Sequence, residues 1–219
     1  MTERCAVLDL GLRDYGEVWA FQQRLVAQRL AGRAPDTLLL VEHPAVYTVG
    51  RRGGEEGLEG LGLPVYHVER GGEVTHHGPG QLVGYPILAL AEGKLEVKAF
   101  IRSLEEILIR TVADFGLSGE RGVHAGVWIG PKKLASIGVA IRHHVTYHGF
   151  ALNVNNDLAP FLRICPCGLE GSALTSMTEV LGRDVDVGAV KPSLLRHFAD
   201  VLERTLEPSP KPLASLLRA

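Results

Sequence analysis

Apolar residues recur at helical spacing in several stretches of the chain. Residues 14–31 follow the 3.6-residue period, with an aspartate placed to cap the first turn and Gly32 placed to end the last. Residues 97–115 carry a clearer apolar stripe that stops before a glycine. The same spacing predicts a third long helix over 189–206 and a short helix over 173–181.

Shorter apolar runs bounded by turn residues predict strands of ordinary length. The predicted strands are 37–41, 45–49, 64–68, 81–88, 123–129, 133–141 and 145–154. The gaps between the last three are short, which favours antiparallel hairpins over parallel crossovers. Because strands cluster with helices between them, the pattern indicates an α+β fold with a mixed or antiparallel sheet, covered by helices on one side.

Two stretches look irregular. Residues 50–62 are rich in glycine and acidic residues and predict a mobile surface loop, and residues from Pro208 onward predict a tail with one helical turn. We find no repeat or linker that would divide the chain. We therefore expect a single domain over residues 1–219.

Composition narrows the class of protein. Hydrophobic residues make up 46% and charged residues 22% of the 219 residues, and the net charge of -2 argues against a general nucleic-acid binder. Three cysteines, two of them in Cys165-Pro166-Cys167, do not form a secreted disulfide framework. The sequence shows neither a signal-peptide pattern nor a membrane-length apolar run, so we expect a cytoplasmic protein.

The densest group of special residues is the segment from Arg70 to Gln81, which we call the glycine-rich segment. It contains four glycines, a proline and two histidines within twelve residues, between two predicted strands. This composition has two interpretations. Either the glycines serve only as turn residues of a hairpin loop, or they let the backbone approach a ligand and aim N–H groups at it. Arg70, Thr75, His76 and His77 on the same loop favour a binding site. No Gly-Lys-Ser or Gly-Lys-Thr follows, so it is not a phosphate P-loop.

Two further segments carry reactive groups. Cys167 lies between Pro166 and Gly168, where its sulfur is either an exposed nucleophile or a small buried apolar group. Lys132 and Lys133 open an apolar strand, and such lysines commonly form a solvated hairpin end. Strand alternation places Lys133 on the same face as Ile137, Val139 and Ile141. If that face lines an apolar cleft, Lys133 is a plausible base.

The remaining histidines do not predict a metal site. Adjacent His143 and His144 on a strand would face opposite ways, and no His-x-x-x-His pattern with an intervening glutamate occurs. The Cys-x-Cys spacing is a poor match to a zinc knuckle.

Four motifs together resemble the lipoyl(octanoyl) transferase family, and the resemblance covers roughly residues 35–180. They are Arg70-Gly-Gly-Glu-Val-Thr-His-His-Gly-Pro-Gly-Gln81, Lys133-Leu-Ala-Ser-Ile-Gly138, His148-Gly-Phe-Ala-Leu-Asn-Val154 and Pro166-Cys-Gly168. Their order also matches. His76 departs from the pattern, since many relatives carry an aromatic residue there, and Cys165 is an extra thiol beside the family's nucleophile position.

The resemblance implies a fold shared with biotin and lipoate protein ligases, a mixed sheet flanked by helices. It implies transfer of an octanoyl group from octanoyl-acyl carrier protein to a specific lysine of a lipoyl domain. Acceptors would be the lipoyl domains of 2-oxoacid dehydrogenases and the glycine-cleavage H protein. The family's reaction starts protein lipoylation and uses no ATP, cofactor or metal.

The resemblance also assigns roles to residues. Cys167 would be the nucleophile that forms an octanoyl thioester, and Lys133 would be its acid–base partner. The predicted acyl-binding residues are Arg70, Gly71, Gly72, Glu73, Val74, Thr75, His76, His77, Ser136, Ile137, Gly138, Gly149, Phe150 and Ala151. Basic residues that could form a rim for acidic protein partners are Arg51, Arg52, Arg70, Lys132, Arg142 and Arg163.

Two alternatives stay open. One is an ATP-dependent lipoate or biotin ligase, which needs a lysine but no cysteine nucleophile. The other is a non-catalytic module that only binds acyl carriers or lipoyl domains. The segment around Cys167 favours the transferase.

Overall fold

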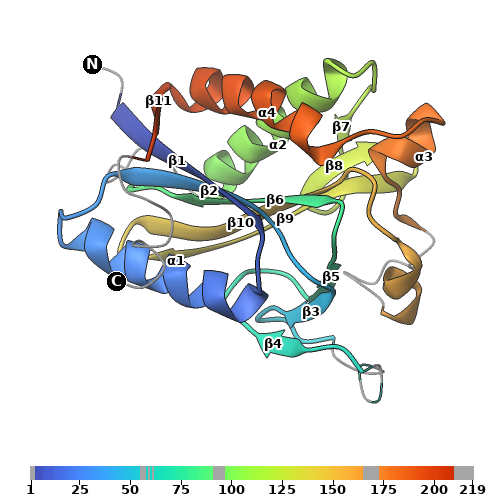
Figure 1. Cartoon of the computed structure of the whole chain (residues 1–219), viewed down its shortest axis with the longest axis horizontal. Helices are drawn as coiled ribbons and strands as arrows, with labels where there is room; N and C mark the ends of the chain where they lie inside the picture. Colours follow the sequence, from blue (N-terminus) through green and yellow to red (C-terminus); the bar gives the residue numbers. More distant parts are fainter. Residues whose placement is uncertain are drawn as a thin grey trace.

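A computed structural model of the chain describes residues 3–54, 58, 60, 62–90, 97–164 and 173–209 (Figure 1). Within these residues the main sheet has the strand order β11-β1-β2-β6-β10-β9-β8-β7. Its strands are β1 (Glu3–Leu12), β2 (Asp36–Glu42), β6 (Gln81–Ile87), β7 (Glu120–Arg121), β8 (Gly126–Ile129), β9 (Lys132–Arg142), β10 (Val145–Asn153) and β11 (Arg204–Pro208). Strand β1 pairs in parallel with β2 and β11, and the other pairs are antiparallel. The sheet is therefore mixed.

A smaller sheet stands beside one end of the main one. It has the order β4-β3-β5, from β3 (Val46–Val49), β4 (Val65–His67) and β5 (Val74–His77). The helices are α1 (Tyr15–Leu30), α2 (Val97–Ala113), α3 (Met177–Leu181) and α4 (Val187–Leu202), with a 3-10 helix η1 (Ala159–Arg163). In the described part of the chain, no helix combines the length and hydropathy needed to cross a bilayer.

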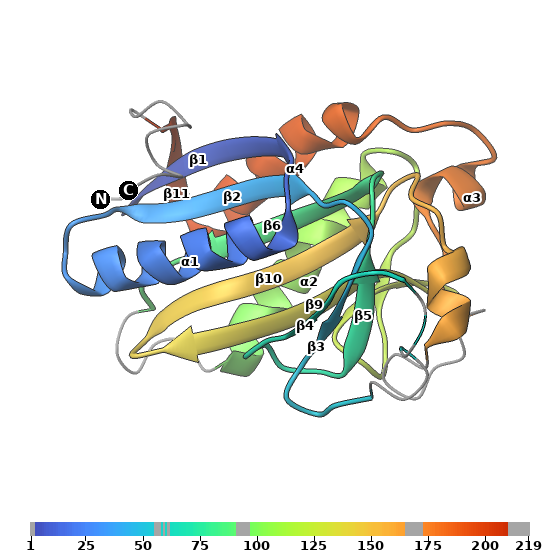
Figure 2. The same ribbon diagram turned by 60° about the horizontal axis from the view of Figure 1, so that its bottom comes forward.

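Helices cover both faces of the main sheet, not one as the strand pattern predicted. Helix α1 buries Phe21 in the same core as Leu39 and Val83, whereas α2 and α4 cover the opposite face, where Phe100 and Leu40 belong to a second core. The two layers lie on opposite sides of the strands in both views (Figures 1 and 2). Strand residues alternate between the two cores, so a central strand such as β2 is almost entirely buried.

Most predicted helices and strands form close to their predicted bounds. Asp14 caps α1 through a hydrogen bond from the Glu17 N–H to its Oδ1 (3.0 Å). The α+β class with a mixed sheet flanked by helices is confirmed. The surface loop predicted over 50–62 lies partly outside the described residues, as does the tail beyond residue 209.

The third long helix ends earlier than predicted, at Leu202. Glu203 adopts a left-handed backbone conformation with φ of 52°, and the chain then forms β11. Strand β11 pairs in parallel with β1, where Glu3 lies opposite Arg204. Neither β1 nor β5 was predicted, and β5 lies between the glycines at positions 71, 72, 78 and 80.

Candidate active site

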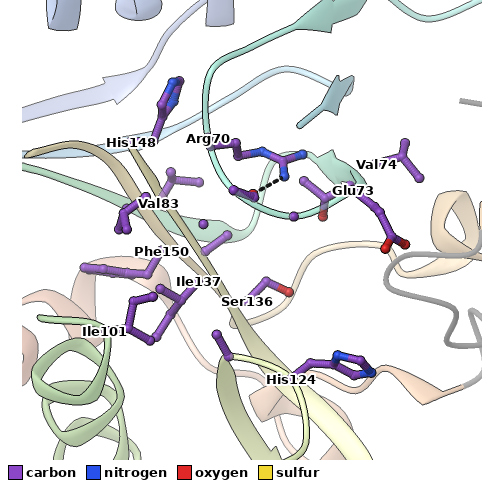
Figure 3. A pocket seen from close by; sticks show the side chains of 18 of the residues that line it. Arg70, Glu73, Val74, Val83, Ile101, His124, Ser136, Ile137, His148 and Phe150 are labelled. Atoms are coloured by element: carbon purple, nitrogen blue, oxygen red, sulfur yellow. Dashed lines mark hydrogen bonds between the residues drawn. The ribbon is translucent and has the colours of Figure 1, made fainter. Parts of the chain in front are cut away.

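A cavity of about 700 Å³ lies where the small sheet meets β9 and β10 of the main sheet. This volume is in the ordinary range for small-molecule sites. Thirteen of the fourteen predicted acyl-binding residues line it, and so does Lys133. The exception is His76. Figure 3 shows Arg70, Glu73 and Val74 on one side of the cavity and Val83, Ile101, Ile137 and Phe150 on another. Cys167, the predicted nucleophile, lies outside the described residues.

The glycine-rich segment is hydrogen-bonded to the edge of the main sheet. The Gly71 N–H donates to the Val139 carbonyl of β9 (3.0 Å). The main-chain N–H groups of Arg51 and Arg52, just after β3, donate to the carbonyls of Arg70 and Gly72 (both 3.1 Å). A Cβ on Gly138 would lie 3.0 Å from the Gly71 oxygen, so glycine permits this close approach. The segment is thus a wall of the cavity as well as a turn.

Arg70 anchors this wall through buried hydrogen bonds. Its Nη2 donates to the Thr48 carbonyl (2.6 Å) and to Thr48 Oγ1 (2.9 Å), and its Nη1 donates to the Gly71 carbonyl (3.1 Å). The guanidinium therefore ties the segment to β3. Arg51 and Arg52 also line the cavity, whereas Lys132, Arg142 and Arg163 are not among its lining residues.

Lys133 faces away from the core under α2 and α4 because β9 contains a bulge. The pairing of β8 with β9 shifts by one residue between Val127 and Trp128, which leaves Leu134 as the extra residue. Consecutive residues Leu134 and Ala135 both join the core under α2 and α4. Lys133 therefore points away from that core, and the prediction that it shares the face of Ile137 is wrong.

The two adjacent lysines differ sharply in environment. Lys132 is exposed, whereas Lys133 is only 5% exposed and lines the cavity. The bridge between Lys133 and Leu174 fixes the backbone at this point, since the Thr175 N–H donates to the Lys133 carbonyl (3.0 Å). Of the two lysines, only Lys132 therefore lies at a solvated hairpin end, as is common for such residues.

A buried group of histidines and tyrosines stands beside the cavity, under the N-terminal half of α1. Tyr15 stacks on His77 with 5.8 Å between ring centroids, and His43 lies edge-on to both rings. His43 donates from Nδ1 to the Arg13 carbonyl (2.8 Å), so its Nε2 accepts from the Tyr85 hydroxyl (2.9 Å). Burial lowers the pKa of His43 to about 4 and that of His77 well below its usual value.

His148 has a carboxylate partner on the glycine-rich side of the cavity. Its Nε2 lies 3.2 Å from Glu69 Oε2, and its backbone N–H donates to Gln22 Oε1 of α1 (2.8 Å). Burial lowers the pKa of His148, and the hydrogen bond from His148 lowers the pKa of Glu69 to about 2. The pair is thus a neutral imidazole that donates to a carboxylate. His148 was noticed in the sequence only as part of a motif, and Tyr15, His43 and Tyr85 were not noticed as site residues.

Buried amides join the glycine-rich segment to the chain beside Lys133. His77 Nδ1 donates to Gln81 Oε1 (2.7 Å), and Gln81 Nε2 donates to Asn153 Oδ1 (2.9 Å). Asn153 Nδ2 in turn donates to the Thr175 carbonyl (3.0 Å). The Thr175 N–H also donates to the Lys133 carbonyl, so this chain of hydrogen bonds runs from His77 to the backbone of Lys133.

His76 packs behind the cavity wall. Its ring lies edge-on to Tyr47 and to Phe161, with centroid distances of 5.2 and 5.5 Å. Neither ring nitrogen has a hydrogen-bond partner, and burial lowers the pKa of His76 to about 4. The side chain is therefore a neutral ring that fills space between Tyr47 and Phe161. It does not line the cavity, because it packs against these two rings instead.

The arrangement suits acyl chemistry. It combines a buried lysine, main-chain N–H groups on a glycine-rich wall, and apolar side chains that could hold a hydrocarbon chain. In the described part of the chain, no group of three or more His, Cys, Asp or Glu side chains could hold a metal ion.

Solved structures of similar shape define the class of fold. A lipoate-protein ligase A bound with ATP superposes with a TM-score of 0.79 at 17% identity, covering 100% of this chain and 93% of that one. The lipoate protein ligase of Thermoplasma acidophilum gives 0.78 at 17% identity, covering 100% and 91%. A biotin protein ligase from Aquifex aeolicus gives 0.58 at 15% identity, covering 90% and 70%. These likenesses concern the fold alone.

Sequence matches then give the family. Residues 14–199 match the lipoyl protein ligase A/B catalytic domain. An octanoyltransferase of Geobacter metallireducens is 45% identical over 93% of this chain and 99% of its own length. One from Syntrophotalea carbinolica is 47% identical over 91% and 95%. The chain belongs to the lipoyl protein ligase A/B family, among the octanoyltransferases, and the resemblance drawn from the four motifs is confirmed.

Proposed function

We propose that this protein transfers an octanoyl group from octanoyl-acyl carrier protein to a lysine of lipoyl domains, through a thioester on Cys167. The observation that carries this proposal is Lys133, a buried lysine in a cavity walled by the glycine-rich segment. Identity of 45% over 93% of the chain with an octanoyltransferase supports the same reaction. Acceptors are the lipoyl domains of 2-oxoacid dehydrogenases and the glycine-cleavage H protein.

The first half-reaction moves the acyl group onto the enzyme. The Cys167 thiolate attacks the thioester carbonyl, and main-chain N–H groups stabilise the tetrahedral oxyanion. Collapse breaks the bond to the carrier sulfur, and the Lys133 ammonium gives that sulfur its proton. The products are octanoyl-Cys167, neutral Lys133 and the free carrier thiol.

The second half-reaction moves the acyl group onto the acceptor. The neutral amine of the acceptor lysine attacks octanoyl-Cys167, an amide bond forms, and the bond to Cys167 breaks. Lys133 takes the proton that the amine nitrogen loses, which restores the ammonium and the Cys167 thiolate. Protons and charges balance over the cycle without ATP.

The test is intact mass after incubation with octanoyl-acyl carrier protein. We expect a gain of one octanoyl group in the unmodified chain and in Cys165→Ala, and no gain in Cys167→Ala. Adduct formation in Cys167→Ala would contradict the assignment of the nucleophile. Binding of carrier without any adduct would favour a non-catalytic module instead.

The fold is shared with ATP-using ligases, so the acyl donor needs its own test. We expect no acyl-adenylate from free octanoate and ATP. Adenylate formation that persists in Cys167→Ser would replace the transferase by a ligase.

A further inference from the structure

The side chain of Lys133 lies between two residues of β8. Trp128 is its cross-strand partner, and the Lys133 Nζ lies 5.7 Å from the centroid of the Trp128 ring. On Gly126 a Cβ would lie 2.8 Å from Lys133 Cε, so the absence of a side chain there leaves room for the lysine. The bulge at Leu134 creates this pairing, because it brings Trp128 opposite Lys133.

Both residues of β8 are themselves held in place. Trp128 is nearly buried, and its Nε1 donates to the His124 carbonyl (3.2 Å). The Gly126 N–H donates to Glu105 Oε1 (3.2 Å), and this buried carboxylate also pairs with Arg121 (3.3 Å). Strand β8 is therefore fixed by hydrogen bonds on the side that faces Lys133.

The chemistry of an indole ring suits an ammonium better than an amine. A cation within about 6 Å of a tryptophan centroid is attracted by the negative face of the ring, and the attraction strengthens when water is excluded. Burial alone has the opposite effect, because it disfavours the charged form of a lysine. At Lys133 the attraction to the indole ring and the effect of burial oppose each other at the same amino group.

We propose that Trp128 is a positioning residue that keeps Lys133 in the cavity as an ammonium in the resting enzyme. This inference rests on the proposed function, in which the ammonium favours the Cys167 thiolate and then protonates the departing carrier sulfur. A neutral resting lysine would have to take its proton from Cys167 first. The indole ring thus favours the ammonium form of Lys133 before substrate arrives.

The direct test is NMR of the chain labelled in the ε-CH₂ and amino groups of lysine. The chain has only six lysines, and Lys133→Arg identifies the signal in question. In the unmodified protein we expect the Lys133 ε-CH₂ signals upfield of those of exposed Lys132, because the Nζ bonded to this group lies over the Trp128 ring. Equal positions for the two lysines would overturn the proposal without any Trp128 variant.

Variants of Trp128 then test the charge. We expect Trp128→Leu to lower the pH midpoint of the Lys133 signal by about 0.5 to 1 unit. Trp128→Phe, which keeps a ring and serves if the leucine variant does not fold, should lower it less. The matched control is Trp19→Leu, because the Trp19 Nε1 donates to Glu69 and Trp19 does not line the cavity. An unchanged midpoint in both Trp128 variants would overturn the proposal.

Kinetics give an independent readout. We expect Trp128→Leu to lower kcat for octanoyl transfer by at most about 3- to 10-fold, which matches a shift of about 0.5 to 1 pH unit, and to leave KM for octanoyl-carrier protein unchanged. A rise in KM with unchanged kcat would mean that Trp128 only shapes the binding surface. The NMR result does not depend on activity, so failure of the proposed function, seen as absence of any adduct, is distinguishable from failure of this inference.

Discussion

The two faces of the main sheet are both buried but differ in chemistry. The face under α2 and α4 is packed with leucine, valine and phenylalanine, and Leu104 of α2 is fully buried against it. The face under α1 is apolar beneath the middle of the helix but polar toward its N-terminus. There His43, His77 and Tyr85 are fully or almost fully buried beside the cavity.

Because of this difference, one face contributes mainly to the stability of the fold and the other carries the polar groups of the site. The apolar face can lose a side chain at a cost in packing only, whereas His43, His77 and Tyr85 on the other face are each held by a specific hydrogen bond. Lys133 belongs with the polar side, because the bulge in β9 turns it away from the apolar core. We therefore expect variants on the two sides to separate activity from stability.

Lys133→Ala should give the largest effect on activity. We expect octanoyl transfer to fall about 10²- to 10⁴-fold, because the proton donor and acceptor of both half-reactions is lost. The measurement is the rate of octanoyl amide formation on a lipoyl domain. Lys132→Ala is the matched control and should keep the full rate, since that side chain is exposed. Equal losses in both variants would remove the distinction between the two lysines.

Leu104→Ala should act on stability alone. We expect the free energy of unfolding to fall by about 2 to 5 kcal/mol, because the side chain is completely buried in the apolar core. Denaturant unfolding measures this change. At temperatures where the variant stays folded, KM for octanoyl-carrier protein should match the unmodified enzyme. A shifted KM would show that the apolar face also shapes the site.

The polar face should make the protein sensitive to acid. The folded state keeps His43 neutral with a pKa of about 4, so between pH 6.5 and 4 the unfolded chain binds more protons. The free energy of unfolding therefore falls as pH falls through this window, by up to about 3 kcal/mol from His43 alone. His43→Gln should flatten the pH dependence of unfolding. His143→Gln, in the exposed β9–β10 turn, is the control and should not change it.

The smallest expected effect concerns His76. Phenylalanine at this position fills the same space between Tyr47 and Phe161 without two unpaired buried nitrogens. We expect His76→Phe to raise the free energy of unfolding by about 1 kcal/mol at pH 7, and by more at pH 5. Transfer activity should be retained, because His76 does not line the cavity. A large loss of activity would place His76 in the site after all.

Local signals predicted much of the fold and of the site. The cap at Asp14 and the apolar period identified α1, and the glycine-rich composition of residues 70–81 identified the cavity wall. Prediction from short-range sequence patterns failed where pairing with a distant strand determined the secondary structure. The chain after Leu202 forms β11 because β1 offers it an unpaired edge, and neither segment alone specifies that pairing.

The features of the site likewise divide into those that the sequence predicted and those that it did not. The amino-acid sequence by itself determined which residues could carry the chemistry and to which family they belong, because glycine-rich loops and reactive side chains leave a direct mark on composition. The tertiary structure decided how these residues face. His76 and His77 are adjacent, yet only His77 reaches the cavity, and a one-residue shift between β8 and β9 turns Lys133 away from the apolar core. Strand alternation is a local rule, and a bulge set by the partner strand reverses it.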